Sequence, residues 1–327
     1  MSLCLAVPNA SAASNPVEAE GLGLPLACTL GETCWAANYV DMDPSAEAQD
    51  FRCGKRTYNG HDGTDFAIRD LAVMAKGVPV VASAPGVVKN VRDGMEDVAL
   101  TDAASRARIK GKECGNGVLV EHGEGWETQY CHLRKGSVVV RANERVQAGQ
   151  QLGLVGLSGQ TEFPHAHLTV RHNGLAVDPF TGRTVGSGCG FAGTMLWRTS
   201  APVPYEEVAL YNAGFASSKP SVEMIRSGLR EDGPFPATAP ALVLWVDLFG
   251  VQAGDRLRFR ITGPDGKAVL EEEEQIEKTQ ARRFVYVGKR RKDKSWTTGA
   301  YTGLVTLTRA AEGKELSREV TRTVAVR

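Results

Sequence analysis

The sequence predicts a mainly β protein in which two domains are built of antiparallel strands. The chain has 327 residues, which exceeds one typical domain, and its 36 glycines separate short runs of alternating apolar residues. Before residue 190 no apolar pattern has the period of a long helix, and after residue 240 strand-like runs recur at regular spacing. The two parts are therefore expected to be separate β-rich units.

Composition gives no electrostatic reason to expect nucleic acid or a membrane surface as a partner. Lysine plus arginine equals aspartate plus glutamate, at 38 each. The sequence contains no run of about 18 apolar residues, so no membrane span is expected. The sequence indicates no particular oligomeric state.

Residues 1–14 resemble the end of an export signal. A short apolar run leads to Ala10-Ser11-Ala12, the small-x-small pattern that signal peptidases cleave. The basic segment that normally begins such a signal is missing, and a disordered alanine-rich tail is the alternative interpretation.

The cysteines point to an oxidising compartment. Cys4 lies in the signal-like segment, which leaves an even set of six without any C-x-x-C spacing. Such a set predicts disulfides rather than zinc or redox chemistry, so the protein is expected to be exported, to the periplasm or outside the cell. Cys114 and Cys131 flank a hairpin-like stretch and are the favoured pair, and residues 15–54 are expected to form a disulfide-tied arm. The six are Cys28, Cys34, Cys53, Cys114, Cys131 and Cys189.

Residues 55–196 are expected to form the first domain, which is punctuated by glycine-rich turns. Its expected elements are a loop entering a strand at 61–68, a hairpin at 78–91 that turns at Pro85-Gly86, a strand pair at 117–133 that turns at Gly123 to Gly125, and a strand, turn and strand at 138–156. The polar residues 93–113 are interpreted as a loop insertion, either a lid or a solvated excursion. Strand alternation places Tyr130 and His132 on one face.

The stretch 153–170 organises this domain. Read as a strand, it places His165, His167 and Thr169 on one face and an apolar set on the other. The two imidazoles then lie about 7 Å apart along the strand. Pro164 suits the first residue of such a strand. On its own, a histidine pair at this spacing is compatible with metal binding or with two solvated side chains.

Residues 197–240 are rich in proline, serine and alanine and are expected to be a linker with a short helix near 221–229. The C-terminal part, 241–327, contains several strand-like runs and a clear turn at Pro264-Asp265-Gly266. This pattern predicts an accessory β-sandwich of immunoglobulin-like type.

The first domain contains the donors that a catalytic zinc ion requires. Such an ion takes three protein ligands and keeps a fourth position for water. His61 and Asp65 lie at the start of one strand and His167 lies on another, which supplies two imidazoles and one carboxylate. His132 and His165 lie on strands whose faces could converge there, where they would hydrogen-bond the water and the developing oxyanion.

Four blocks of this domain resemble, in order and spacing, the lysostaphin/LytM-type zinc endopeptidases. The hallmark is H-x-x-x-D followed by H-x-H, with Tyr-x-His-Leu between them. The resemblance covers roughly residues 55–182 and implies an antiparallel peptidase fold of the duplicated hybrid motif type. The blocks are HDGTD at 61–65, GVVKNV at 86–91, YCHL at 130–133 and GLVGLSGQTEFPHAHLTV at 153–170.

Carried over by position, the resemblance implies that His61, Asp65 and His167 are the Zn²⁺ ligands. It makes His132 and His165 the catalytic histidines, without deciding which of the two takes a proton from water. The implied activity is hydrolysis of peptide cross-links in bacterial peptidoglycan, with wall stem peptides as the substrate. The zinc ion would polarise the scissile carbonyl and acidify its water.

Two other functions are alternatives to this activity. A non-catalytic cell-wall-binding or amidase-activating protein would have the same fold, but such members usually lack the zinc ligands. A lipoyl- or biotin-type carrier would need a modifiable lysine, and residues 145–170 contain none. The remaining polar candidates are expected to pack or to be solvated: Tyr58, Tyr130, His122, His172, Asp62 and Asp178.

Overall fold

The computed structural model describes residues 15–100, 102, 107, 109–231, 233–292, 294–311 and 314–327. The signal-like segment at 1–14 lies outside these residues, as does part of the expected insertion at 93–113. The chain is mainly β, and all its paired strands are antiparallel. Among the residues that the structure describes, no helix has the length and apolar character needed to cross a membrane.

The first domain is built on one eight-stranded sheet in the order β1-β2-β9-β6-β5-β4-β7, with β10 paired to β9. Its strands are β1 (Cys34–Asn38), β2 (Thr64–Ile68), β4 (Gly86–Arg92), β5 (Asn116–Gly123), β6 (Trp126–Leu133), β7 (Arg145–Val146), β9 (His165–His172) and β10 (Leu175–Val177). A second, two-stranded sheet pairs β3 (Pro79–Val81) with β8 (Gln151–Leu154), and two short helices of the described residues are α1 (Pro16–Ala19) and α2 (Leu71–Lys76). One apolar core lies between these sheets.

The strand pair predicted at 117–133 is confirmed as β5 and β6, but the hairpin predicted at 78–91 is wrong. β3 pairs with β8, whereas β4 pairs with β5 and β7. The connecting backbone has partners outside a hairpin, since the N–H of Ser83 donates to the Tyr130 hydroxyl (2.7 Å). Residues 83 and 84 are fully buried, so this connection passes through the core.

The N-terminal arm is more ordered than its irregular sequence suggested. It contributes β1, which pairs with β2 and so lies beside the strand that contains Asp65. Disulfides tie Cys28 to Cys34 and Cys53 to Cys189. The pairing of Cys114 with Cys131 is confirmed, and it joins the two strands of the β5–β6 hairpin near their ends.

The C-terminal part consists of two antiparallel sheets that share one apolar core. The three-stranded sheet contains β11 (Ala209–Ala216), β12 (Ala241–Val251) and β15 (Gln280–Arg290); the four-stranded sheet contains β13 (Arg256–Thr262), β14 (Ala268–Gln275), β16 (Gly299–Ala311) and β17 (Lys314–Val326). The strand predictions beyond residue 240 are thus confirmed. Within the stretch expected as a linker, α4 (Val222–Ser227) is the predicted short helix, and β11 joins the C-terminal sheet.

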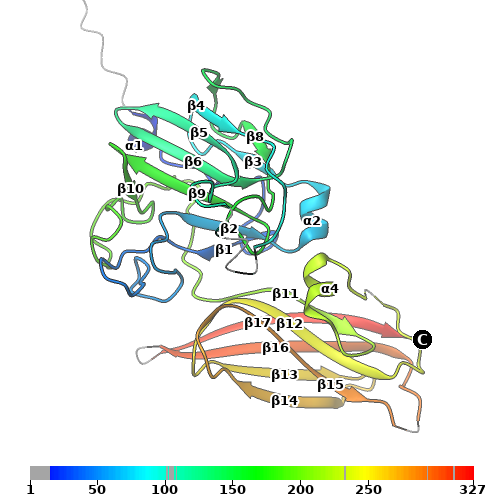
Figure 1. Cartoon of the computed structure of the whole chain (residues 1–327). Helices are drawn as coiled ribbons and strands as arrows, with labels where there is room; N and C mark the ends of the chain where they lie inside the picture. The colour runs from blue at the N-terminus through cyan, green and yellow to red at the C-terminus, as the bar shows by residue number, and fades with distance from the viewer. Residues whose placement is uncertain are drawn as a thin grey trace, which may run out of the picture.

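The two domains meet along an aromatic contact. Figure 1 shows β1 and β2 at the side of the first domain that faces the C-terminal sheets. A buried cluster joins Trp35, Ala37 and Ala67 of the first domain to the second. Its members from the second domain are Ala209, Tyr211 and Phe249, and Phe163 of the first domain packs against the cluster.

Candidate metal centre

Two neighbouring strands bring the predicted ligands together. β2 and β9 are antiparallel, and Asp65 lies directly opposite His167. As predicted, the alternation in β9 directs Ala166, Leu168 and Val170 into the core. His165 and His167 therefore lie on the opposite face. His61 comes from the loop that leads into β2.

Three donor atoms converge at this point. His61 Nε2 lies 3.2 Å from Asp65 Oδ1 and 3.2 Å from His167 Nδ1, and His167 Nδ1 lies 2.9 Å from Asp65 Oδ1. The three residues form a buried group whose ligand atoms all lie within 4.8 Å of one another.

The other polar atoms of these three side chains are held by the surrounding protein. His61 Nδ1 lies 2.6 Å from the carbonyl oxygen of Tyr39, which can only accept, so Nδ1 carries the proton. Asp65 Oδ2 accepts a hydrogen bond from Asn38 Nδ2 (2.9 Å). His167 Nε2 lies 2.9 Å from Thr169 Oγ1 and 3.3 Å from Asp62 Oδ1. Such outer contacts orient histidine ligands and leave the other nitrogen free for a metal ion.

The donor set fits zinc. Two imidazole nitrogens and one carboxylate oxygen are a common ligand set of catalytic zinc sites, which leave one position for water or substrate. Harder ions such as calcium prefer six to eight oxygen ligands, whereas two of the three donors here are nitrogens.

His132 reaches the same region through a break in the alternation of β6. The prediction that Tyr130 and His132 share a face is wrong, because Tyr130 lies in the core. The ring of His132 instead lies 4.7 Å from the ring of His165 and 5.9 Å from that of His167. His132 has a φ of 63°, a backbone conformation that non-glycine residues seldom adopt. Such conformations cluster at functional sites.

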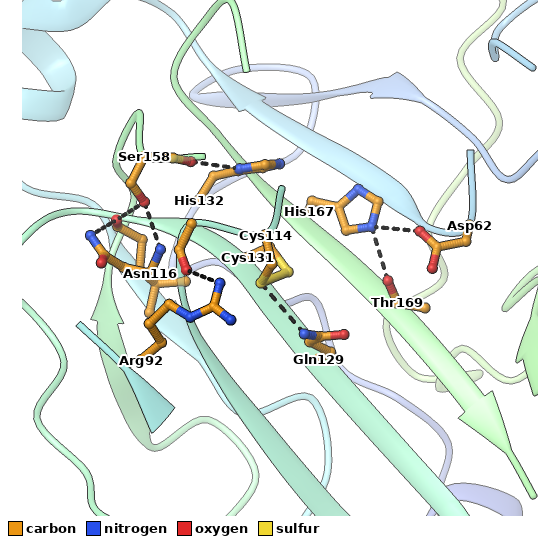
Figure 2. The surroundings of a disulfide bond; sticks show 12 residues. Asp62, Arg92, Cys114, Asn116, Gln129, Cys131, His132, Ser158, His167 and Thr169 are labelled. Atoms are coloured by element: carbon orange, nitrogen blue, oxygen red, sulfur yellow. Dashed lines mark hydrogen bonds and ion pairs between the residues drawn. A yellow bond between two sulfur atoms is a disulfide. The ribbon is translucent and has the colours of Figure 1, made fainter. Parts of the chain in front are cut away.

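A contact with Ser158 fixes the tautomer of His132, and its buried surroundings favour its neutral form. Its Nδ1 donates to the carbonyl oxygen of Ser158 (2.7 Å), as Figure 2 shows. Burial, together with the imidazoles of His165 and His167, lowers the pKa of His132 well below its usual range. Nε2 of His132 therefore keeps a lone pair that can accept a proton.

His165 is held from both sides of its ring. Its Nδ1 lies 2.9 Å from the carbonyl oxygen of Phe163 and 3.0 Å from Thr161 Oγ1. Its Nε2 lies 3.3 Å from Asp65 Oδ1, which directs this nitrogen toward the three converging donors. The structure thus brings together all five site residues that the sequence indicated.

The carboxylates near His167 set the charge of the group. Burial disfavours the ionised form of Asp65, but the nearby imidazoles, above all those of His61 and His165, hold its pKa well below the usual range. Burial also disfavours the charged form of His167, yet Asp62 and Asp65 outweigh it and raise the pKa of His167 to about 9. Without a metal ion, His167 is therefore protonated at neutral pH.

Most of the remaining polar candidates lie elsewhere, as expected. His122 bonds to the Pro85 carbonyl and Thr128, and His172 stacks on Trp126. Asp178 is buried, and its Oδ2 accepts a hydrogen bond from the Thr181 hydroxyl. Tyr58, by contrast, stacks on His61 with ring centroids 4.4 Å apart and is half exposed, so it lies beside the centre.

Sequence reasoning assigned Asp62 to the surface or to packing, but the structure places it against His167. Asp62 also pairs with Arg171 (3.4 Å). Its position inside HDGTD was an available signal, as was the same-face spacing of Thr169 and His167. The contacts of Asn38 and of the Tyr39 carbonyl had no such signal, because they depend on the pairing of β1 with β2.

The sequence is similar to those of known peptidases. Residues 59–179 match the sequence model of Peptidase family M23. The DD-carboxypeptidase/endopeptidase Mpg of Neisseria meningitidis serogroup B is 33% identical over 125 residues, which is 38% of this chain and 23% of that protein. The peptidoglycan DD-endopeptidase ShyA of Vibrio cholerae is 32% identical over 118 residues, 36% of this chain and 22% of that protein. The chain therefore spans less than a quarter of the length of these relatives.

Solved structures give a weaker match. The catalytic domain of the antimicrobial peptidase lysostaphin from Staphylococcus simulans is 21% identical, with a TM-score of 0.29. The superposition covers 43% of this chain and 85% of that domain.

Proposed function

We propose that the protein is a zinc-dependent endopeptidase that hydrolyses the peptide cross-links of bacterial peptidoglycan. The match of residues 59–179 to the sequence model of Peptidase family M23 supports this proposal. One observation supports the proposal above all others. His61 Nε2, Asp65 Oδ1 and His167 Nδ1 converge, while the second polar atom of each side chain is engaged by the protein. The relatives named as DD-endopeptidases suggest wall stem peptides as the substrate.

The three donors would hold the zinc ion, and the two further histidines would move protons beside it. A bound zinc ion supplies Lewis-acid chemistry, which polarises a carbonyl and lets water lose a proton near neutral pH. His132 is neutral and has a free lone pair on Nε2, so we assign it the proton from the attacking water. His165 presents Nε2 to the same space, so we assign it the stabilisation of negative charge that develops on the carbonyl oxygen.

We also propose where the protein acts and how its domains are divided. Three disulfides suit an exported protein that works in the periplasm or outside the cell. We place the peptidase domain at residues 55–196 and an accessory β-sandwich of immunoglobulin-like type after it. β11 is included in the sandwich because it pairs with β12.

One observation favours a second candidate function, a non-catalytic cell-wall-binding or amidase-activating protein. The five site residues are at most 8% exposed, so a substrate must gain access before it can be cleaved. A binding protein would need no such access. Zinc content and turnover, measured together, separate the two candidates.

The test measures bound zinc by emission spectroscopy and digestion of purified muropeptides by chromatography. We expect one zinc per chain and turnover in the wild type. His167→Ala should lose both, whereas His132→Ala should keep zinc and lose turnover by about 10²- to 10⁴-fold. His172→Ala is the matched control and should lose neither, because His172 stacks on Trp126 outside the centre. Wild-type protein that holds no zinc yet binds peptidoglycan would support the second candidate.

A further inference from the structure

Phe163, just before β9, packs between the proposed catalytic histidine His165 and the C-terminal domain. We call this arrangement of Phe163 between the two domains the clamp. Phe163 lies two positions before His165, and their ring centroids are 4.8 Å apart. On its other side, Phe163 lies 5.4 Å from the ring of Phe249 on β12 in the C-terminal domain. One aromatic side chain therefore contacts both the proposed catalytic histidine and the neighbouring domain.

A fixed arginine of the C-terminal domain completes the clamp. The guanidinium carbon of Arg282 lies 5.5 Å from the centroid of the Phe163 ring and 5.6 Å from that of Phe249. Arg282 Nε donates to the Tyr211 hydroxyl (2.7 Å), and its Nη2 lies 3.4 Å from Asp247 Oδ2. Asp247 is fully buried, so these contacts hold the guanidinium in place over the aromatic rings.

The backbone transmits the position of Phe163 to His165. The Phe163 carbonyl accepts a hydrogen bond from His165 Nδ1 (2.9 Å) and another from the Thr161 hydroxyl (2.8 Å). The sheet partner of His165 is Ala67, which belongs to the buried cluster between the domains. Phe163, which contacts the His165 ring, and Ala67, which pairs with His165 in the sheet, thus both pack against the C-terminal domain.

We propose that the C-terminal domain orients His165, with Phe163, Phe249 and Arg282 as positioning residues. The proposal rests on the proposed function, because His165 is there one of the two catalytic histidines. It gives the accessory domain a role within the reaction itself, apart from any anchoring to the wall. A reacting group displaced by about 1 Å can cost roughly 100-fold in rate, so loosening the clamp is sufficient to impair turnover.

The test compares full-length variants on a soluble cross-linked muropeptide. Phe249→Ala and Arg282→Ala should each lower kcat by roughly tenfold or more, with KM changed less than about twofold and one zinc retained. Arg282 is partly exposed and is the less disruptive change if Phe249→Ala fails to fold. Tyr286→Ala is the control, since Tyr286 lies on the same strand but contacts Phe284 instead and should leave kcat unchanged.

A double-mutant cycle decides whether the effect passes through His165. In a His165→Ala background, Arg282→Ala should produce no further loss of kcat. An equal loss in both backgrounds, or an unchanged kcat in Arg282→Ala alone, would overturn the proposal.

A spectroscopic measurement separates this proposal from the proposed function. In full-length protein with ¹⁵N-labelled histidine, the imidazole nitrogen signals of His165 should shift in Arg282→Ala and stay in place in Tyr286→Ala. If the wild type shows no turnover, the proposed function fails, yet this comparison still tests the clamp. Unchanged His165 signals in Arg282→Ala would overturn the clamp even in an active enzyme.

Discussion

At the scale of single residues, the charge of His167 is set by two carboxylates on either side of its ring. Asp65 Oδ1 lies 2.9 Å from Nδ1 and Asp62 Oδ1 lies 3.3 Å from Nε2. Both stabilise the imidazolium, which raises the pKa of His167 to about 9 against the effect of burial. A metal ion at Nδ1 must therefore displace a proton at neutral pH.

This competition gives zinc binding a defined pH dependence. Below the raised pKa His167 holds the extra proton, and above it the imidazole is neutral. Apparent zinc affinity should thus rise about tenfold per pH unit between pH 7 and 9 and level off above, for one proton released. Titration calorimetry in buffers of different ionisation enthalpy measures that proton. In Asp62→Asn the release at pH 8 should diminish, and proton release that stays constant from pH 7 to pH 10 would contradict this assignment.

Gly63 allows the ligand loop to approach β9. A Cβ at this position would lie 2.5 Å from His167 Nε2 and 2.6 Å from the Leu168 carbonyl oxygen. Gly63→Ala should therefore displace His167, destabilise the fold by about 1–3 kcal/mol and lower zinc content. Gly23→Ala is the control, because the nearest atom to its added Cβ would be 3.4 Å away. Thermal unfolding and metal analysis of the two variants test the expectation. Equal stability and equal zinc content in the two variants would show that the close approach at Gly63 is not required.

At the scale of elements, the end of β6 is fixed by its disulfide. Cys131 directly precedes His132, and the carbonyl of its partner Cys114 accepts a hydrogen bond from the His132 N–H (2.8 Å). Figure 2 shows the Cys114–Cys131 disulfide close to His132. The bond thus supports the unusual backbone conformation that directs His132 toward the proposed metal ligands.

Replacing both Cys114 and Cys131 by serine should affect stability and turnover together. The pair is separated by 17 residues, so its loss should cost about 3 kcal/mol in the free energy of unfolding. Turnover should fall while zinc is retained, because the ligands lie on β2, on β9 and in the loop before β2. Replacing Cys28 and Cys34, which are separated by 6 residues, should cost about 2 kcal/mol and leave turnover unchanged. Urea denaturation measures the free energy of unfolding, and muropeptide assays measure turnover. Equal turnover in the two double variants would contradict this expectation.

The elements that sequence predicted are those with a clear local pattern. The apolar alternation of β9 predicted its strand and the face that carries His165 and His167, and the Pro264-Asp265-Gly266 turn lies between β13 and β14. The prediction of a hairpin at 78–91 was wrong because its two strands pair with distant segments, and a local sequence pattern does not indicate such pairing. The predicted orientation of His132 was wrong for another reason. The positive φ of His132 breaks the strand alternation on which that prediction depended.

At the scale of the whole molecule, the contact between the domains includes a buried arginine. Arg56 of the first domain is 2% exposed, and its Nη2 donates to the Ala36 carbonyl. It lies against Gly250 at the end of β12, which has a φ of 74° and leaves no room for a side chain beside Arg56. These two residues therefore form a close contact between the domains.

Gly250→Ala should therefore loosen this contact. Its Cβ would overlap Arg56 Nη1 and Cδ, and scanning calorimetry should resolve two unfolding transitions where the wild type shows one. Gly254→Ala has a matching φ of 96° with no atom within 4 Å of its Cβ, so it carries the backbone strain without the clash. Two transitions in both variants, or in neither, would contradict coupling through Arg56.

Anomalous diffraction at the zinc absorption edge, recorded from crystals of the zinc-loaded protein, tests the central claim most directly. We expect one strong peak about 2.0–2.2 Å from His61 Nε2, Asp65 Oδ1 and His167 Nδ1 together. His132 and His165 should lie beside that peak without binding the ion. A map without a peak at this position, or with zinc bound by other residues, would contradict the assignment of the metal centre and the hydrolytic function proposed from it.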